Sequence, residues 1–107
     1  QCEIKTTMVY GYPACKNDTG CVSIMQDVAT SMGITNADCP PSLGAEDFGY
    51  FSEQKPAAVA WFGMGDPTGA HELTPHHNPK FYLYDEKGLP LAFEYLLSVY
   101  LKAANTL

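Results

Sequence analysis

Two adjacent histidines, His76 and His77, are the side chains of this chain best suited to chemistry. A neutral imidazole is a good zinc ligand, and a backbone restricted by proline can hold a histidine at a fixed angle to a metal ion. Pro75 and Pro79 bracket the pair. Adjacent histidines in a loop are, however, commonly solvated surface residues, and a single histidine cannot build a metal site. The residues by themselves leave both interpretations open.

A pair of neighbouring carboxylates, Glu46 and Asp47, is the second candidate for chemistry. Such a pair could orient a ligand histidine, bind a substrate group, or act as acid and base. It could also complement the macrodipole at the start of a short helix, which is the interpretation that the residues alone favour. The sequence patterns of serine hydrolases, P-loop proteins, HExxH zinc proteases and dinucleotide-binding proteins do not occur.

The charge balance excludes several kinds of partner. Twelve acidic residues against six basic ones give a net charge of -6, and every basic residue is lysine. Nucleic acids and anionic membranes both require clustered positive charge, and no apolar run approaches the roughly 20 residues that cross a bilayer. We therefore expect neither a nucleic-acid nor a membrane partner, and a globular chain with one core.

Four cysteines bear on the cellular compartment. They are Cys2, Cys15, Cys21 and Cys39, and their spacing fits no CxxC zinc pattern. The even number permits two disulfides, as in a secreted domain, and four free thiols in a cytosolic chain are the alternative. The cysteines leave this question open, and the cytoplasm is the location that we predict.

The elements that must hold these side chains follow from hydrophobic periodicity. Residues 3–10 alternate with β-branched and aromatic residues before a Gly-Tyr-Pro breaker, which predicts a strand. Residues 56–65 form a short apolar run ended by glycines, which is typical of a strand buried on both faces. Prolines and glycines interrupt residues 65–80, so all three histidines are predicted to lie in one long loop.

Three helical segments complete the prediction. Apolar residues recur at intervals of three to four positions over about 19–32, after an Asn-Asp capping pair. A second apolar stripe runs over about 89–104, with Pro90 in its first turn, and a short helical turn is expected at 45–51. Together these elements predict an α/β fold in which a small sheet is packed by two amphipathic helices.

Three segments resemble, in their order and spacing, the closing motifs of one enzyme family. They read GAEDFGYF at 44–51, FGMG at 62–65 and PHHNPKF at 75–81. The set is similar to the aminoacylase-like branch of metallopeptidase family twenty, which includes N-acyl-amino-acid amidohydrolases, hippurate hydrolases and auxin-conjugate hydrolases. In that family a Gly-Ser-Glu-Asp-Phe turn, an apolar strand, a His-Ser-Pro-x-Phe loop and a final amphipathic helix follow one another.

The resemblance also implies a division of the chain. Residues 1–14 correspond to the final strand that returns from an inserted lid or dimerisation domain. Residues 15–107 correspond to the C-terminal segment of the metallohydrolase catalytic domain. The expected fold is accordingly the C-terminal part of a zinc-peptidase-like catalytic domain.

Carried over by position, His77 matches the family's C-terminal metal-ligand histidine. Glu46 and Asp47 match the acidic pair on the turn that faces the same cleft, as second-shell or substrate-cleft residues. His76 stands where the family usually has an apolar residue, and Asn78 stands where serine is common. The resemblance therefore assigns a role to neither of them.

For the complete enzyme the resemblance implies hydrolysis of amide bonds in N-acyl amino acids or peptides. Two zinc ions would lower the pKa of a bridging water and polarise the carbonyl. The family's other ligands and its general-base glutamate come from N-terminal motifs that this chain lacks, and His71 matches no ligand position. We therefore expect no catalytic residue here, no tight zinc binding and no activity by the chain alone. Its partner would be the missing N-terminal catalytic segment.

The alternative is a truncated, non-catalytic module that acts as a small oligomerising or binding protein. A sheet that has lost its central neighbours would expose an edge, and an exposed edge invites pairing with a second copy. Whether this chain is itself an enzyme stays undecided at the level of sequence.

Overall fold

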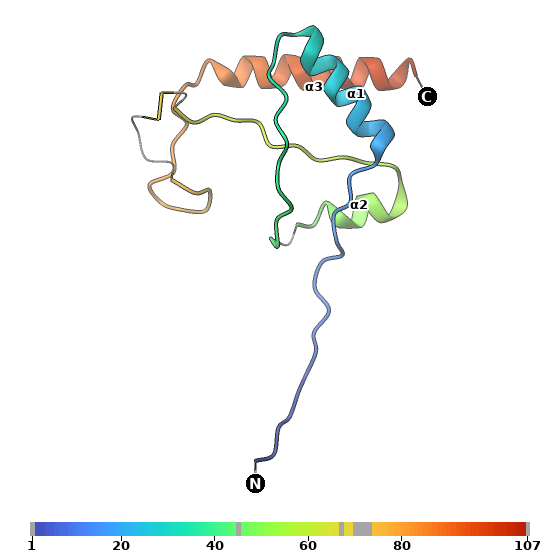
Figure 1. Cartoon of the computed structure of the whole chain (residues 1–107), viewed down its shortest axis with the longest axis vertical. Helices are drawn as coiled ribbons and strands as arrows, with labels where there is room; N and C mark the ends of the chain where they lie inside the picture. Colours follow the sequence, from blue (N-terminus) through green and yellow to red (C-terminus); the bar gives the residue numbers. More distant parts are fainter. Residues whose placement is uncertain (1, 45, 67, 70–73, 107) are drawn as a thin grey trace.

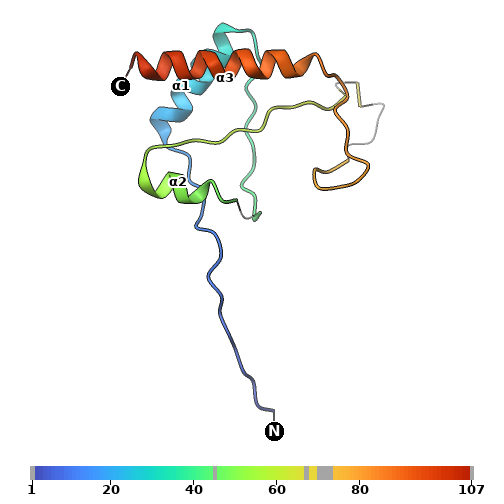
Figure 2. The same ribbon diagram turned by 180° about the vertical axis from the view of Figure 1, so that it is seen from behind.

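The computed structural model describes residues 2–44, 46–66, 68–69 and 74–106. Within them the chain forms three helices, α1 (Thr19–Ser31), α2 (Gly49–Gln54) and α3 (Gly88–Ala104). Helix α3 lies across α1, and extended chain connects the helices (Figures 1 and 2). The segment that precedes α1 runs away from the helices as one extended stretch (Figure 1).

Helix α1 begins at a capping aspartate and ends before a glycine, as the sequence predicts. The Asp18 carboxylate accepts a hydrogen bond from the backbone N–H of Cys21 at 3.0 Å. This bond satisfies one of the free N–H groups at the start of the helix. Gly33 follows the helix with a φ of 70°, a left-handed conformation that glycine adopts without strain. The helix predicted at 19–32 is thus confirmed to within one residue.

Helix α3 confirms the C-terminal helix predicted at 89–104. Pro90 lies in its first turn, where the missing N–H of proline costs no helical hydrogen bond. At the first residue of the helix, Gly88, the backbone lies close to the Met64 side chain, because an added Cβ would lie 2.6 Å from the Met64 sulfur. None of the helices in the described part of the chain is long and apolar enough to cross a membrane.

The core lies where α3 crosses α1. Val28 and Ala29 from α1 and Tyr95 from α3 are buried there. The Tyr95 hydroxyl donates to the carbonyl oxygen of Met25 at 3.2 Å, and the Phe62 ring lies 6.2 Å from the Tyr95 ring. Burial raises the pKa of Tyr95, so its hydroxyl remains a donor at neutral pH. The partly buried residues around this core are Met25, Met32, Ile34, Phe62 and Val99.

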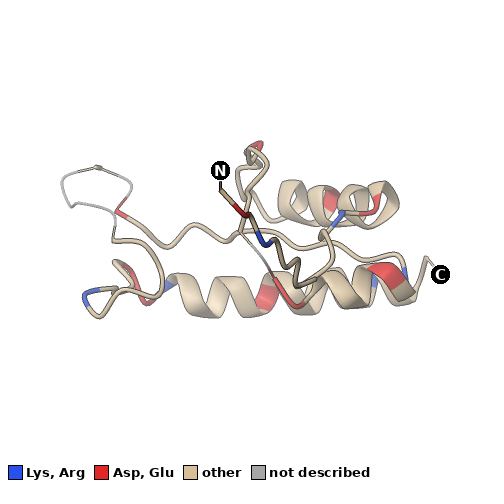
Figure 3. Cartoon of the chain, turned by 90° about the horizontal axis from the view of Figure 1, so that it is seen from below, with Lys and Arg blue, Asp and Glu red and all other residues tan. Residues whose placement is uncertain are grey.

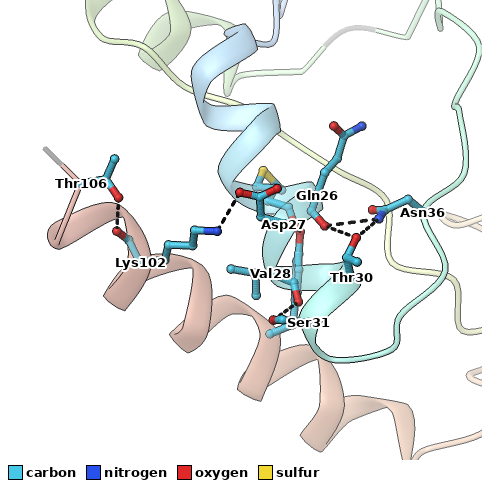
Figure 4. A network of polar contacts seen from close by, with 10 residues as sticks. Gln26, Asp27, Val28, Thr30, Ser31, Asn36, Lys102 and Thr106 are labelled. Carbon is cyan, nitrogen blue, oxygen red and sulfur yellow. Dashed lines mark hydrogen bonds and ion pairs between the residues drawn. The ribbon is translucent and has the colours of Figure 1, made fainter.

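Polar contacts border the helix crossing (Figure 4). Lys102 of α3 forms an ion pair with Asp27 of α1 at 2.8 Å. These side chains are 41% and 62% exposed, so water screens the pair and it contributes little stability. The Asn36 amide donates to Gln26 O at 3.4 Å and to Thr30 Oγ1 at 3.3 Å. These bonds tie the chain that follows α1 back onto the helix.

Helix α2 is shifted from the helical turn predicted at 45–51, of which residue 45 lies outside the described residues. It spans Gly49–Gln54 and starts at a buried glycine. A Cβ added to Gly49 would lie 2.5 Å from the carbonyl oxygen of Pro13, so only glycine permits this approach. The start of the helix is therefore packed against a segment 36 positions earlier in the chain, which local sequence could not indicate.

The predicted small sheet is not present in the described part of the chain. Residues 3–10 and 56–65 were expected to be strands, and neither is assigned as a strand. The expected α/β class is therefore wrong, because the regular elements described are all helices. A strand requires a neighbour that supplies backbone hydrogen bonds, whereas the side-chain pattern indicates only which faces could be buried. Ile4, Val9 and Tyr10 consequently remain exposed.

All four cysteines, each within the described residues, have free thiols. The sequence left open two disulfides or four free thiols, and the structure has the free thiols. Cys21, on the first turn of α1, is half-buried. Burial raises the pKa of its thiol, and the neighbouring Asp18 carboxylate raises it further. This thiol is therefore less ionised at neutral pH than an ordinary cysteine.

Replacing Val28 by alanine should destabilise the chain, because two buried methyl groups leave the α1–α3 contact. We expect the free energy of unfolding to fall by about 2 kcal/mol. Urea unfolding followed by helical circular dichroism measures this change. The matched control is Val9→Ala, at a position that is 85% exposed. Equal losses in the two variants would show that the helix crossing is not the core.

The cap of α1 should make stability depend on pH. The backbone hydrogen bond from Cys21 lowers the pKa of Asp18 below its ordinary value of 3.8. The stabilisation is therefore fully present above pH 3.8 and is lost as the pH falls through the lower folded-state value. Urea unfolding across acidic pH should show this loss in the native chain. Asp18→Asn keeps a capping side chain that does not ionise, so the variant should lack this component of the pH dependence. Identical pH profiles would contradict the assignment.

Candidate functional site

His77 lies in a tight turn and has a left-handed backbone conformation, with a φ of 66°. This conformation costs a non-glycine residue about 1 kcal/mol and persists only where the surroundings impose it. Asn78 closes the turn, because its side-chain oxygen accepts from Lys80 N and its carbonyl oxygen accepts from Phe81 N, each at 2.9 Å. These hydrogen bonds lie directly after His77, whose imidazole is exposed.

His76 contacts two aromatic rings. Its imidazole lies 5.3 Å from the Trp61 ring, with an interplanar angle of 31°. It also lies 4.8 Å from the His77 ring, at 67°, in an edge-to-face arrangement. Both separations are in the range of attractive aromatic pairs. His76, to which the resemblance assigns no role, therefore links the extended segment at 56–65 to the candidate ligand His77.

The position of Trp61 depends on hydrogen bonds between the start of α1 and the extended segment at 56–65, which we call the clamp. The Asn17 side-chain amide donates to Val59 O at 2.8 Å, and its oxygen accepts from Val59 N at 2.9 Å. Beside it, Asp18 N donates to Ala57 O at 2.8 Å. The Asn17 amide thus pairs with a backbone as a neighbouring strand would. Sequence reasoning identified these two residues as helix-capping chemistry and missed the clamp.

A hollow with a volume of 330 Å³ opens beside the Trp61–His76 pair. Its lining includes Trp61, Phe62, Asp66, His76, Phe81 and Tyr84. Asp66 is buried, and its Oδ1 accepts from Thr68 N at 2.8 Å and from Thr68 Oγ1 at 2.7 Å. The sequence signal for this turn, an aspartate two positions before a threonine, was overlooked. A carboxylate and an imidazole on one hollow can bind a polar group or take part in proton transfer.

The acidic pair lies apart from the histidine turn. Gly49 N donates to Glu46 O at 3.2 Å and Tyr50 N donates to Asp47 O at 3.0 Å, so the pair occupies the turn that leads into α2. Both carboxylates are exposed, and Glu46 Oε1 accepts from Asp47 N at 3.0 Å. Helix α2 and the turn around His77 lie on separate sides of the chain (Figures 1 and 2). Within the described residues, no hydrogen bond or ion pair joins either carboxylate to His77.

The described residues supply part of a zinc site at most. Structural zinc sites take four protein ligands, and catalytic sites take three and keep one position open. Across residues 2–44, 46–66, 68–69 and 74–106, no group of three or more His, Cys, Asp or Glu side chains could hold a metal ion. His77 fits the requirement for one imidazole donor, because it is exposed on a turn. The other ligands would have to come from elsewhere.

The sequence matches the model of Peptidase family M20/M25/M40 over residues 1–102, and the chain belongs to this family. The family consists of hydrolases that are in general metal-dependent. The resemblance drawn from the three short motifs is thereby confirmed at the level of the family. No solved structure matches the chain.

Individual relatives match over part of their length. The chain is 34% identical over 73 residues to an N-acetyldiaminopimelate deacetylase of Streptococcus suis, which covers 68% of this chain and 18% of the relative. It is 31% identical over 82 residues to the uncharacterized hydrolase y4tI of Sinorhizobium fredii, covering 75% and 20%. An N-acetyldiaminopimelate deacetylase of Shouchella clausii is 40% identical over 43 residues, covering 40% and 12%. The chain thus spans about a fifth or less of the length of these relatives.

Removing the Asn17 side chain should loosen the segment that carries Trp61. Asn17→Ala eliminates both side-chain hydrogen bonds to Val59, so the amide proton of Val59 should exchange with solvent about fivefold faster, as expected for a net loss of about 1 kcal/mol. Hydrogen exchange followed by NMR measures this rate. The control is Asn36→Ala, which removes hydrogen bonds only to Gln26 and Thr30. An unchanged rate at Val59 would rule out the clamp.

Proposed function

We propose that this chain is the C-terminal part of a zinc-dependent amidohydrolase or peptidase that cleaves amide bonds of N-acyl amino acids or peptides. The observation that carries the proposal is family membership over residues 1–102, combined with a length that spans only 18% of a deacetylase relative. Relatives named deacetylase and hydrolase support the reaction class. The chain contributes no catalytic residue of its own, so it is inactive alone.

The proposed division of the chain follows the family pattern. In the complete protein residues 1–14 correspond to the segment that returns from an inserted lid or dimerisation domain, and residues 15–107 belong to the catalytic domain. The extended course of residues 2–14 supports this division. So does the contact of Pro13 with Gly49, which joins the end of the returning segment to α2.

The uncovered surface of α3 supports a large partner. Phe93, Leu96 and Tyr100 are 69%, 62% and 67% exposed, although α3 carries few charges (Figure 3). Contiguous exposed apolar surface of this kind marks an interaction site. In the proposal its partner is the N-terminal catalytic segment, which also supplies neighbours for the extended residues 56–65.

In the complete enzyme His77 is the metal ligand that this chain supplies. The exposed imidazole on a turn supports this role. Two zinc ions would generate the attacking hydroxide and polarise the scissile carbonyl when bound. Glu46 and Asp47, which lie apart from the histidine turn in this chain, contact ligands or substrate only once the partner is in place. Four free thiols support a cytoplasmic location.

A second candidate function is a truncated module that forms oligomers or binds another protein. The same exposed α3 residues, and the extended segments 3–10 and 56–65 without strand partners, favour it. Sedimentation of the chain alone discriminates between the two. If the chain sediments strictly as a monomer, the oligomerising function is excluded.

The main test uses the chain together with the upstream segment encoded by its own gene. His77→Ala should remove about one zinc ion per subunit and lower hydrolysis of N-acetylated amino acids by roughly 100-fold or more. His71→Ala is the matched control, since that position matches no ligand, and it should change neither quantity. Zinc content by elemental analysis and product formation are the measurements. Full activity in His77→Ala, or hydrolysis by the chain alone, would refute the proposal.

A further inference from the structure

Three aromatic rings form a series of contacts, in which Trp61 contacts His76 and His76 contacts His77. The Trp61 and His76 rings are 5.3 Å apart and tilted by 31°, and the His76 and His77 rings are 4.8 Å apart and edge to face. Asn17 holds the segment that carries Trp61 through its two hydrogen bonds to Val59. The series therefore starts from an anchored backbone and reaches the exposed imidazole.

We propose that Trp61 and His76 are positioning residues that hold the imidazole of His77 in the orientation in which it meets a metal ion. The inference rests on the proposed function of His77 as a ligand. It adds two residues that no family motif assigns.

The need for such positioning follows from the surroundings of His77. Hydrogen bonds to Asn78 order the residues that follow His77, but they do not restrict the rotation of the imidazole of His77 about its own side-chain bonds. His77 is exposed, and among the described residues its ring contact is with His76. A ligand that is already held in one orientation loses less freedom when a metal binds. The His76 ring supplies this restriction, and Trp61 in turn holds His76.

The competing role for His76 is that of a second metal ligand. The two roles differ in what they require of the ring. Positioning requires a flat aromatic surface that packs on Trp61 and His77, whereas ligation requires a ring nitrogen. Phenylalanine has the surface and lacks the nitrogen, so His76→Phe separates the two roles and His76→Ala removes both.

The experiment uses NMR of the 107-residue chain with labelled histidines, first without metal and then with zinc added to millimolar concentration. Trp61 is the sole tryptophan in the sequence, so cross-peaks from indole to imidazole protons are unambiguous. In the native chain and in His76→Phe we expect cross-peaks between the ring of residue 76 and Trp61. We also expect the ring signal of His77 to be shifted from that of a free imidazole. His76→Ala and Trp61→Ala should return the His77 signal to that of a free imidazole. Zinc affinity at His77 should fall roughly tenfold in these two variants and stay unchanged in His76→Phe.

Each outcome decides between the roles. A metal-free His77 signal that is the same in His76→Ala and in the native chain overturns the proposal. A His76→Phe variant that binds zinc as weakly as His76→Ala also overturns it, because His76 is then a ligand. A third outcome is that the ring cross-peaks are present but zinc does not change the His77 signal, either in the chain or in the longer protein. This outcome would support the contacts among the three rings and refute the ligand role of His77 on which the proposed function depends.

Discussion

The contact between α1 and α3 at Tyr95 is the interaction on which the rest of the chain depends. Tyr95 places its ring against Val28 and Ala29 and its hydroxyl on the carbonyl oxygen of Met25. Apolar burial supplies the favourable free energy here, and the hydrogen bond satisfies a polar group that would otherwise be costly to bury. Phe62 adds its ring to the same contact, so the core also holds the extended segment that leads to the candidate site.

The candidate site is built outward from this core. Segment 56–65 is held at one end by Asn17 and near the other by Phe62 against Tyr95, so Trp61 lies between two fixed points. The histidine turn is positioned by hydrogen bonds within itself and by its ring contact with Trp61. A loop of polar and proline-rich composition thus acquires a defined geometry from contacts with residues distant in sequence.

The chain buries little of its apolar surface. Among the described residues three buried apolar residues form the core, and long apolar side chains along α3 stay exposed. A domain of this size ordinarily buries well over half of the surface of its unfolded chain. In the proposed function, these uncovered faces contact the rest of a larger catalytic domain.

The sequence by itself determined the helices α1 and α3 and the family, because periodicity, capping and short motifs are recorded in consecutive residues. Only the tertiary structure decided the rest. The expected sheet failed because strand formation depends on a neighbour that the pattern of residues 56–65 cannot supply. The pairing of Asn17 with Val59 and the stack of Trp61 on His76 join residues far apart along the chain, and no local signal specifies which distant group a side chain will meet.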